Sequence, residues 1–101
     1  MYGVFGKFES ISGQRDTLLA YLLEAAQGLQ EYPTCYLYVV SVDPTDPNGI
    51  WVNEVWQSKE DHQASLALEA TQKLIVVARP LISNITQRIE VTPVGGKGIP
   101  E

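Results

Sequence analysis

Histidine and cysteine are almost missing from this chain of 101 residues, which has one of each, His62 and Cys35. A single cysteine cannot form an internal disulfide. One cysteine and one histidine also cannot supply the three or four ligands of a zinc site from these residue types. We therefore expect no structural metal.

Basic residues are also scarce, since seven Lys and Arg stand against twelve Asp and Glu, for a formal net charge of −5. A chain of this sign has no basic patch for a phosphate backbone or an anionic membrane surface. The apolar runs fall far short of the ~20 residues that span a bilayer, and the N-terminus lacks the pattern of a secretory signal. The sequence therefore predicts a cytoplasmic protein that binds neither nucleic acid nor membrane.

What the chain does contain is enough apolar sequence for one core. Apolar residues make up 45% of it and charged residues 19%, which is typical of a globular domain. Two separate cores would each be too small to be stable alone. We place a single domain at residues 1–94, and a flexible or partner-bound tail at residues 95–101, with the sequence GGKGIPE.

Hydrophobic periodicity divides the domain into seven elements. Residues 2–9 and 84–94 alternate with period two, whereas 35–42 and 50–56 are strands joined by the turn at 43–49. Helical spacing marks residues 14–30, after an N-cap at Ser12 or Gly13, and a stretch from about residue 70 to Pro80. Ser58 and Asp61 fit a capping box, so another helix begins at Ser58.

The order β, α, β, β, α, α, β favours a ferredoxin-like α+β fold, with a four-stranded antiparallel sheet and helices on one face. Residues 35–42 and 50–56 are apolar on both faces, however, and helices can cover only one. An exposed apolar face of that size is unusual in a monomer. We expect this face to pack on a second copy in a two-fold dimer. A monomer with a curled sheet is the alternative.

Several short motifs point to a known family. They are Pro33 and Cys35 before the second strand, Tyr38, Asp46-Pro47, and above all Glu54-Val55-Trp56 with Ser58. Further matches are M-Y-G at the start, H-x-A-S-L from His62 to Leu66, R-P-L-I at 79–82 and P-V-G-G at 93–96. Over nearly its whole length the chain resembles the antibiotic biosynthesis monooxygenase family of dimeric α+β barrels, which includes quinol monooxygenases.

The chain departs from this family at its histidines. Many members carry histidine at the positions of Ser65 and Ala70. The haem-degrading relatives use an asparagine, a tryptophan and a histidine, and two of those positions resemble Ser65 and Ile75 here. The resemblance therefore argues against haem degradation.

The resemblance implies insertion of oxygen into an electron-rich phenol, quinol or anthrone without metal, flavin or another cofactor. The substrate loses a proton, its anion passes an electron to molecular oxygen, and the radical pair recombines. Such chemistry needs a dry aromatic pocket, a proton acceptor tuned toward neutral pH, and donors that stabilise the anion. The alternative is a non-catalytic dimeric domain of the same fold that binds a small molecule or serves in assembly.

Two residues are candidates for the proton acceptor. His62 leads because its unperturbed pKa is ~6.5 and it shares a helix face with Leu66, which should point toward the core. Its alternative role is that of a boundary residue on a capped helix. Glu54 is the second candidate, with a pKa raised if its strand face is covered. Its alternative is a structural ion pair with Arg79 or Arg88.

Four further residues are candidates for substrate binding: Tyr38, Trp56, Ser65 and Arg79. The aromatic rings could form the wall of a pocket for a flat ligand or could simply belong to the core. Arg79 could bind an anionic group of a substrate, or it could complement the C-terminal end of the preceding helix.

Overall fold

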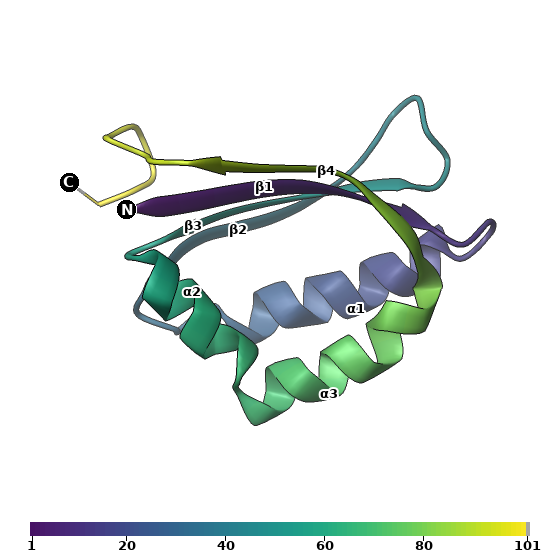
Figure 1. Cartoon of the computed structure of the whole chain (residues 1–101), viewed down its shortest axis with the longest axis horizontal. Coiled ribbons are helices and arrows are strands. Elements are labelled where there is room, and N and C mark those ends of the chain that lie inside the picture. Colours follow the sequence, from purple (N-terminus) through teal and green to yellow (C-terminus); the bar gives the residue numbers. More distant parts are fainter. Residues whose placement is uncertain (101) are drawn as a thin grey trace.

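In the computed structural model, which describes residues 1–100, four strands form one antiparallel sheet and the helices cover one of its faces (Figure 1). The strands are β1 (Tyr2–Ser10), β2 (Cys35–Val42), β3 (Gly49–Trp56) and β4 (Ile82–Val91). The helices are α1 (Arg15–Gly28), α2 (Lys59–Leu66) and α3 (Glu69–Ala78), and a single 3-10 turn, η1 (Arg79–Leu81), follows α3. The strand order β2-β3-β1-β4 is that of the predicted ferredoxin-like α+β fold.

The helix starts agree only in part with the predicted caps. Helix α1 begins at Arg15 after Gln14, which makes no side-chain cap, so the predicted cap at Ser12 or Gly13 is wrong. Helix α2 is capped as predicted, because Ser58 Oγ accepts a hydrogen bond from the Asp61 amide at 3.1 Å. The Asp61 carboxylate does not reach back to a backbone amide, however, since it accepts from the Ser58 hydroxyl instead at 2.7 Å. None of the helices in residues 1–100 is long and apolar enough to cross a membrane.

Strand β4 departs most from its prediction, because it begins two residues earlier than expected and contains an irregularity. The register of β1 with β4 shifts after Lys7, so that Phe8 faces Ile85. A bulge of this kind adds one residue and reverses the alternation of side chains. Ile85 therefore lies on the covered face together with Arg88. The period-two alternation predicted for residues 84–94 would place Ile85 and Ile89 on one face, and this part of the prediction is wrong.

The core lies between the sheet and the helices in two clusters. Leu18 of α1 packs on Ile50 and Val52 of β3, together with Ala78 of α3. The second cluster, of Tyr2, Val4 and Trp56, lies at the other end of the two central strands. Because alternate residues of a strand share one face, the even-numbered positions of β3 face the helices. Glu54 is one of these positions.

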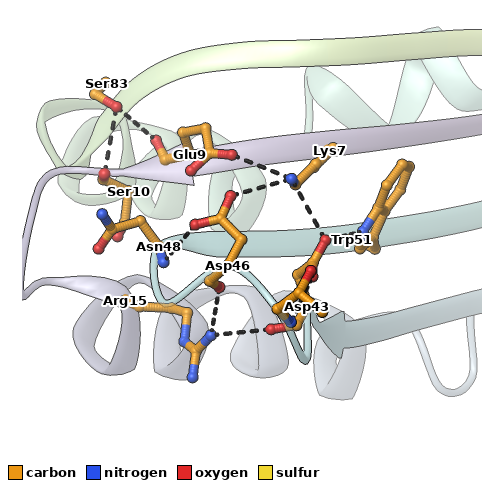
Figure 2. Close-up of polar contacts among 10 residues, drawn as sticks. Lys7, Glu9, Ser10, Arg15, Asp43, Asp46, Asn48, Trp51 and Ser83 are labelled. Carbon is orange, nitrogen blue, oxygen red and sulfur yellow. Dashed lines mark hydrogen bonds and ion pairs between the residues drawn. The ribbon is translucent and has the colours of Figure 1, made fainter.

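The turn between β2 and β3 is attached to β1 by a group of charged residues that we call the Lys7 cluster (Figure 2). Lys7 Nζ lies 3.0 Å from Asp46, 3.3 Å from Glu9 and 3.4 Å from Asp43. Arg15, in the first turn of α1, donates to the Asp46 carbonyl at 2.9 Å. The cluster thus joins the turn, the central strand and the start of α1 at one end of the molecule.

Candidate functional site

A pocket of about 1060 Å³ lies between the sheet and the helices. Its floor includes Val4, Gly6 and Phe8, which alternate along β1, and its roof includes residues of α3 such as Leu74 and Ile75. The space exists because α3 packs mainly against α1 and η1 rather than on the sheet. In Figure 1, α3 accordingly lies beside α1, on the same side of the sheet.

The structure brings all of the predicted site residues to this pocket. Each lines its wall: Tyr38, Glu54, Trp56, His62, Ser65 and Arg79. Arg79 also directly follows α3, at the position where a positive charge complements the helix end. The six residues therefore share one location, and their catalytic and binding roles stay predictions.

Glu54 lies in the middle of β3 with its carboxyl group under the helices. Trp56 Nε1 donates a hydrogen bond to Glu54 Oε1 at 3.0 Å, while Oε2 accepts none from residues 1–100 and is not sealed off. Burial raises the pKa of the Glu54 carboxyl to about 7, even though the indole donor lowers it. The predicted ion pair with Arg79 or Arg88 does not form among these residues.

His62 approaches Glu54 from helix α2. Its ring lies against Tyr2 and Trp56, with centroid distances of 5.6 and 5.5 Å. Its Nε2 is 3.6 Å from Glu54 Oε1, which is longer than a hydrogen bond. Burial, and then the nearby charge of Arg88, lower the pKa of His62, so the imidazole is neutral at pH ~7. The site therefore joins a carboxyl group that titrates near neutrality to an uncharged imidazole.

Tyr38 and Ser65 differ in what their hydroxyl groups can still do. Tyr38 lies directly opposite Glu54 in the pairing of β2 with β3, and burial raises the pKa of its phenol. It therefore stays protonated and can donate to a ligand. Ser65 is buried and donates its proton to the His62 carbonyl at 2.6 Å. Ser65 thus contributes to the wall of the pocket and to the geometry of α2.

Two residues of the site were not identified from the sequence. Arg88 lines the pocket and donates to the Tyr2 hydroxyl at 3.4 Å and to Glu90 at 3.0 Å. The missing signal was the bulge in β4, without which Arg88 and Ile85 do not share a face. No sequence pattern indicated a site role for Tyr2, which lies at the start of the chain. No group of three or more His, Cys, Asp or Glu within residues 1–100 could hold a metal ion.

The fold and the pocket define the class: a ferredoxin-like α+β domain with a deep, mainly apolar pocket and a carboxyl–imidazole pair inside it. A family model for antibiotic biosynthesis monooxygenases matches residues 1–75. The chain belongs to this family, as the sequence motifs indicated. No curated protein matches the chain.

One solved structure gives the same assignment, and others share the fold. A candidate antibiotic biosynthesis monooxygenase from Chloroflexus aurantiacus J-10-fl is 47% identical, with a TM-score of 0.89 and 98% of each chain covered. A candidate of the same kind from Deinococcus radiodurans is 20% identical, with a TM-score of 0.81 over 100% of each chain. A protein from Pseudomonas aeruginosa is 13% identical, with a TM-score of 0.82 over 93% of this chain and 94% of that one. The last two likenesses show the fold alone.

Proposed function

We propose that this protein is a monooxygenase that inserts oxygen into a small quinol- or anthrone-like substrate without metal or flavin, with Glu54 as its base. Family membership supports a monooxygenase type of activity. The observation that carries the proposal is the Glu54 carboxyl group, which has a pKa of about 7 in an apolar pocket. Its Oε2 accepts no hydrogen bond from residues 1–100 and can meet a substrate.

The first step is removal of a proton from the substrate. The indole of Trp56 holds Oε1 in place, so Oε2 of the carboxylate can face the acidic O–H or C–H of the substrate. A base works best when its pKa lies near the working pH, and Glu54 meets this condition better than a solvated carboxylate does. His62 is uncharged beside it, and because its pKa is lowered while that of Glu54 is raised, the proton stays on the Glu54 carboxyl group.

The second step is electron transfer, which takes place between the substrate anion and oxygen. The substrate anion gives one electron to O₂, and the two radicals combine to form a C–O bond. The product of this combination is a peroxide anion, which takes back the proton held by Glu54 and becomes a hydroperoxide. With an anthrone, the hydroperoxide then loses water, so that a CH₂ group becomes a carbonyl, one oxygen atom stays in the product and the other leaves in water. The Tyr38 phenol next to Glu54 can donate to the anionic oxygen of the substrate while charge develops there.

A non-catalytic binding domain is the second candidate, and the pocket could serve it as well. A filled interior would favour an assembly role alone, but this interior is open and has polar groups at one place. The arrangement of Glu54, His62 and Tyr38 favours the enzyme, because simple binding of an apolar ligand gives no reason for a carboxyl group with a raised pKa.

The direct test is oxygen uptake by metal-stripped protein with a panel of anthrones and hydroquinones. Three proteins are compared: the parent, Glu54→Gln, and Glu31→Gln as a control with the same chemical change at an exposed position. We expect uptake above the spontaneous rate in the parent and in Glu31→Gln, and none above that rate in Glu54→Gln. Binding of the panel without any uptake would favour the non-catalytic domain.

We also propose that the open face of the sheet packs against a second copy of the chain. A row of paired residues crosses all four strands on this face: Val39, Asn53, Phe5 and Ile89. Val39 and Ile89 are 43% and 49% exposed. All helices lie on the other side (Figure 1), and a two-fold dimer lets this row, which is apolar except for Asn53, pack against its own copy.

The oligomeric state tests this second proposal by sedimentation of the parent, Val39→Glu and Val42→Glu. Val39 and Val42 are almost equally exposed on the same strand, at 43% and 44%, but they face opposite sides of the sheet. We expect a dimer in the parent and in Val42→Glu, and a monomer in Val39→Glu. A monomeric parent at micromolar concentration would refute the dimer.

A further inference from the structure

We infer that the ligand of this pocket is elongated, with a hydroxylated aromatic head beside Glu54 and an apolar body that passes over Gly6 toward Ile82. The inference rests on the proposed function and deepens it by naming the shape of the substrate. It also assigns Gly6 as the residue that sets how long the ligand can be. The length of the pocket, its one-sided polarity and the space above Gly6 carry it.

The pocket is long because it follows strand β1. Val4, Gly6 and Phe8 line it in succession, and Val4 pairs with Glu54 at the polar end. Four residues along a strand correspond to ~13 Å. Ile82 also lines the pocket and pairs with Ser10, which is two residues beyond Phe8. The lining therefore extends well past the length of one aromatic ring.

Polar groups gather at one end of this length. Glu54 and His62 meet there, Tyr38 lies opposite Glu54, and Arg88 reaches the hydroxyl of Tyr2, which pairs with Trp56 at the same end. Toward the other end the floor and walls are apolar: Phe8, Val77, Ala78, Ile82 and Ile85. Arg79 is also at that end, and it is exposed, as Arg88 is at the polar end. The remaining polar residues of the lining come from α1 and α3: Glu24, Gln27 and Lys73, which are exposed, and Thr71, which is half-buried.

The volume supports the same shape. A pocket for a drug-sized ligand usually measures ~300–1000 Å³. At about 1060 Å³ this pocket would hold a single-ring quinol with most of its space left to water. Because the proposed chemistry requires a dry site, an apolar body that fills the remaining space would serve it better than a lone ring.

Gly6 leaves the middle of the floor without a side chain. A Cβ built there would meet only the Gln87 carbonyl oxygen, at 3.6 Å, and the Phe8 ring, at 4.0 Å, which are ordinary contacts. Gly6 has no positive φ, so other residues can adopt its backbone conformation. A larger side chain at this position should therefore fold normally and rise into the pocket between its polar and apolar ends.

Binding without oxygen tests the inference independently of the reaction. Tryptophan fluorescence under anaerobic conditions would follow methylhydroquinone, decylhydroquinone and a dihydroxyanthrone binding to the parent, to Gly6→Leu and to Gly95→Leu. Gly95 is the matched control, because a Cβ there meets nothing within 4 Å, it has no positive φ, and it does not line the pocket. The decyl and dihydroxyanthrone probes distinguish a chain from a fused-ring body, because the better fit binds more tightly.

We expect the parent to bind at least one long probe ~10-fold or more tightly than methylhydroquinone, since each buried methylene contributes about three- to fourfold. Gly6→Leu should lose this advantage and keep the affinity for methylhydroquinone, and Gly95→Leu should behave as the parent. Gly6→Ala, which adds one methyl group, should lose part of the advantage and serves if the leucine variant does not fold.

Equal affinity of the parent for short and long probes would overturn the inference, as would an equal loss of all three probes in Gly6→Leu or Gly6→Ala. The proposed reaction and the elongated ligand can be refuted independently of each other. Selective binding of a long probe without oxygen uptake in air would contradict the proposed reaction and support the elongated ligand. Oxygen uptake without tighter binding of the longer probes would support the proposed reaction and contradict the elongated ligand.

Discussion

Two tryptophans of this protein donate their indole N–H to a carboxyl group, and the two carboxyl groups respond in opposite directions. Trp56 donates to Glu54 at 3.0 Å, and Trp51 donates to Asp43 at 3.2 Å. The pKa of Glu54 is raised to about 7, whereas that of Asp43 lies well below its usual range. An indole donor therefore does not decide the charge of its acceptor.

The surroundings of the two carboxyl groups decide it. Asp43 accepts from the amide and the hydroxyl of Thr45, each at 2.9 Å, and lies 3.4 Å from Lys7 (Figure 2). These donors favour the charged form, and solvent reaches the group. Glu54 lies under the helices beside an uncharged imidazole. One carboxyl group thus holds a turn, while the other can exchange a proton near pH ~7.

The largest difference between the two groups should appear in catalysis. Glu54→Gln removes the proposed base, so kcat/KM should fall ~10²–10⁴-fold, the usual contribution of a general base. Asp43→Asn removes a carboxylate outside the pocket and should leave kcat/KM within ~2-fold of the parent. Steady-state oxygen uptake at saturating O₂ measures both. A comparable loss of activity in the two variants would end the distinction.

The second largest difference between Glu54 and Asp43 should appear in how the free energy of unfolding depends on pH. Because the folded pKa of Glu54 lies above its unfolded value, 4.5, its stabilising contribution is complete below that value and is lost as pH rises through about 7. Between pH ~5 and pH ~8 the parent should lose about 2–3 kcal/mol that Glu54→Gln does not lose. Urea unfolding at both pH values measures this.

The stability that Asp43 contributes should change with pH in the opposite direction, because the folded pKa of Asp43 is lowered. Its stabilising contribution is present above the ordinary pKa of an aspartate, 3.8, and is lost as the pH falls through the lower folded value. Asp43→Asn should therefore be less stable than the parent at neutral pH, and the difference should shrink in acid.

If Glu54→Gln lost as much stability as the parent between pH ~5 and pH ~8, Glu54 would not be desolvated.

A smaller effect should follow a change of the imidazole. If Glu54 is the base and the His62 ring only shapes the pocket wall beside it, His62→Gln should lower kcat/KM by ~10-fold, less than the general-base contribution lost in Glu54→Gln. The rise of kcat/KM with pH should keep its midpoint near 7, because this midpoint belongs to Glu54. Loss of the midpoint in His62→Gln would instead make His62 the base, as the sequence alone suggested.

The smallest effect should come from Lys7, the cation that lies beside Asp43. Lys7→Met leaves Asp43, Asp46 and Glu9 without their shared partner, so the melting temperature should fall by a few degrees. The difference should shrink in about 1 M salt, because screening weakens such pairs. Oxygen uptake should not change. A fall that salt does not reduce would indicate lost packing of the lysine chain.

Much of this arrangement could be predicted from the sequence where the signal is local. Alternation identified β1, the turn at residues 43–49 identified the hairpin of β2 and β3, and the Ser58 cap identified the start of α2. His62 faces the sheet, as its spacing from Leu66 predicted, but the expectation that Leu66 points to the core is wrong, because Leu66 is 41% exposed. The short-range rules of backbone geometry and hydrophobic periodicity were sufficient for these features.

The remaining features depend on contacts between distant segments. The bulge that turns Ile85 and Arg88 to the same face arises from the pairing of β4 with β1, which no local pattern records. The choice between an ion pair and an indole donor for Glu54 also depends on which side chains the folded chain places nearby. For the same reason the sequence did not predict the Lys7 cluster.

The measurement that tests the central claim most directly is the titration of Glu54 itself. NMR of protein with glutamate labelled at the carboxyl carbon would follow its signal from about pH 4 to about pH 9, with Glu54→Gln used to assign it. We predict a midpoint near 7, well above 4.5, the ordinary pKa of a glutamate. A midpoint near 4.5 would contradict the account, because Glu54 would then be an ordinary carboxylate and a weak base.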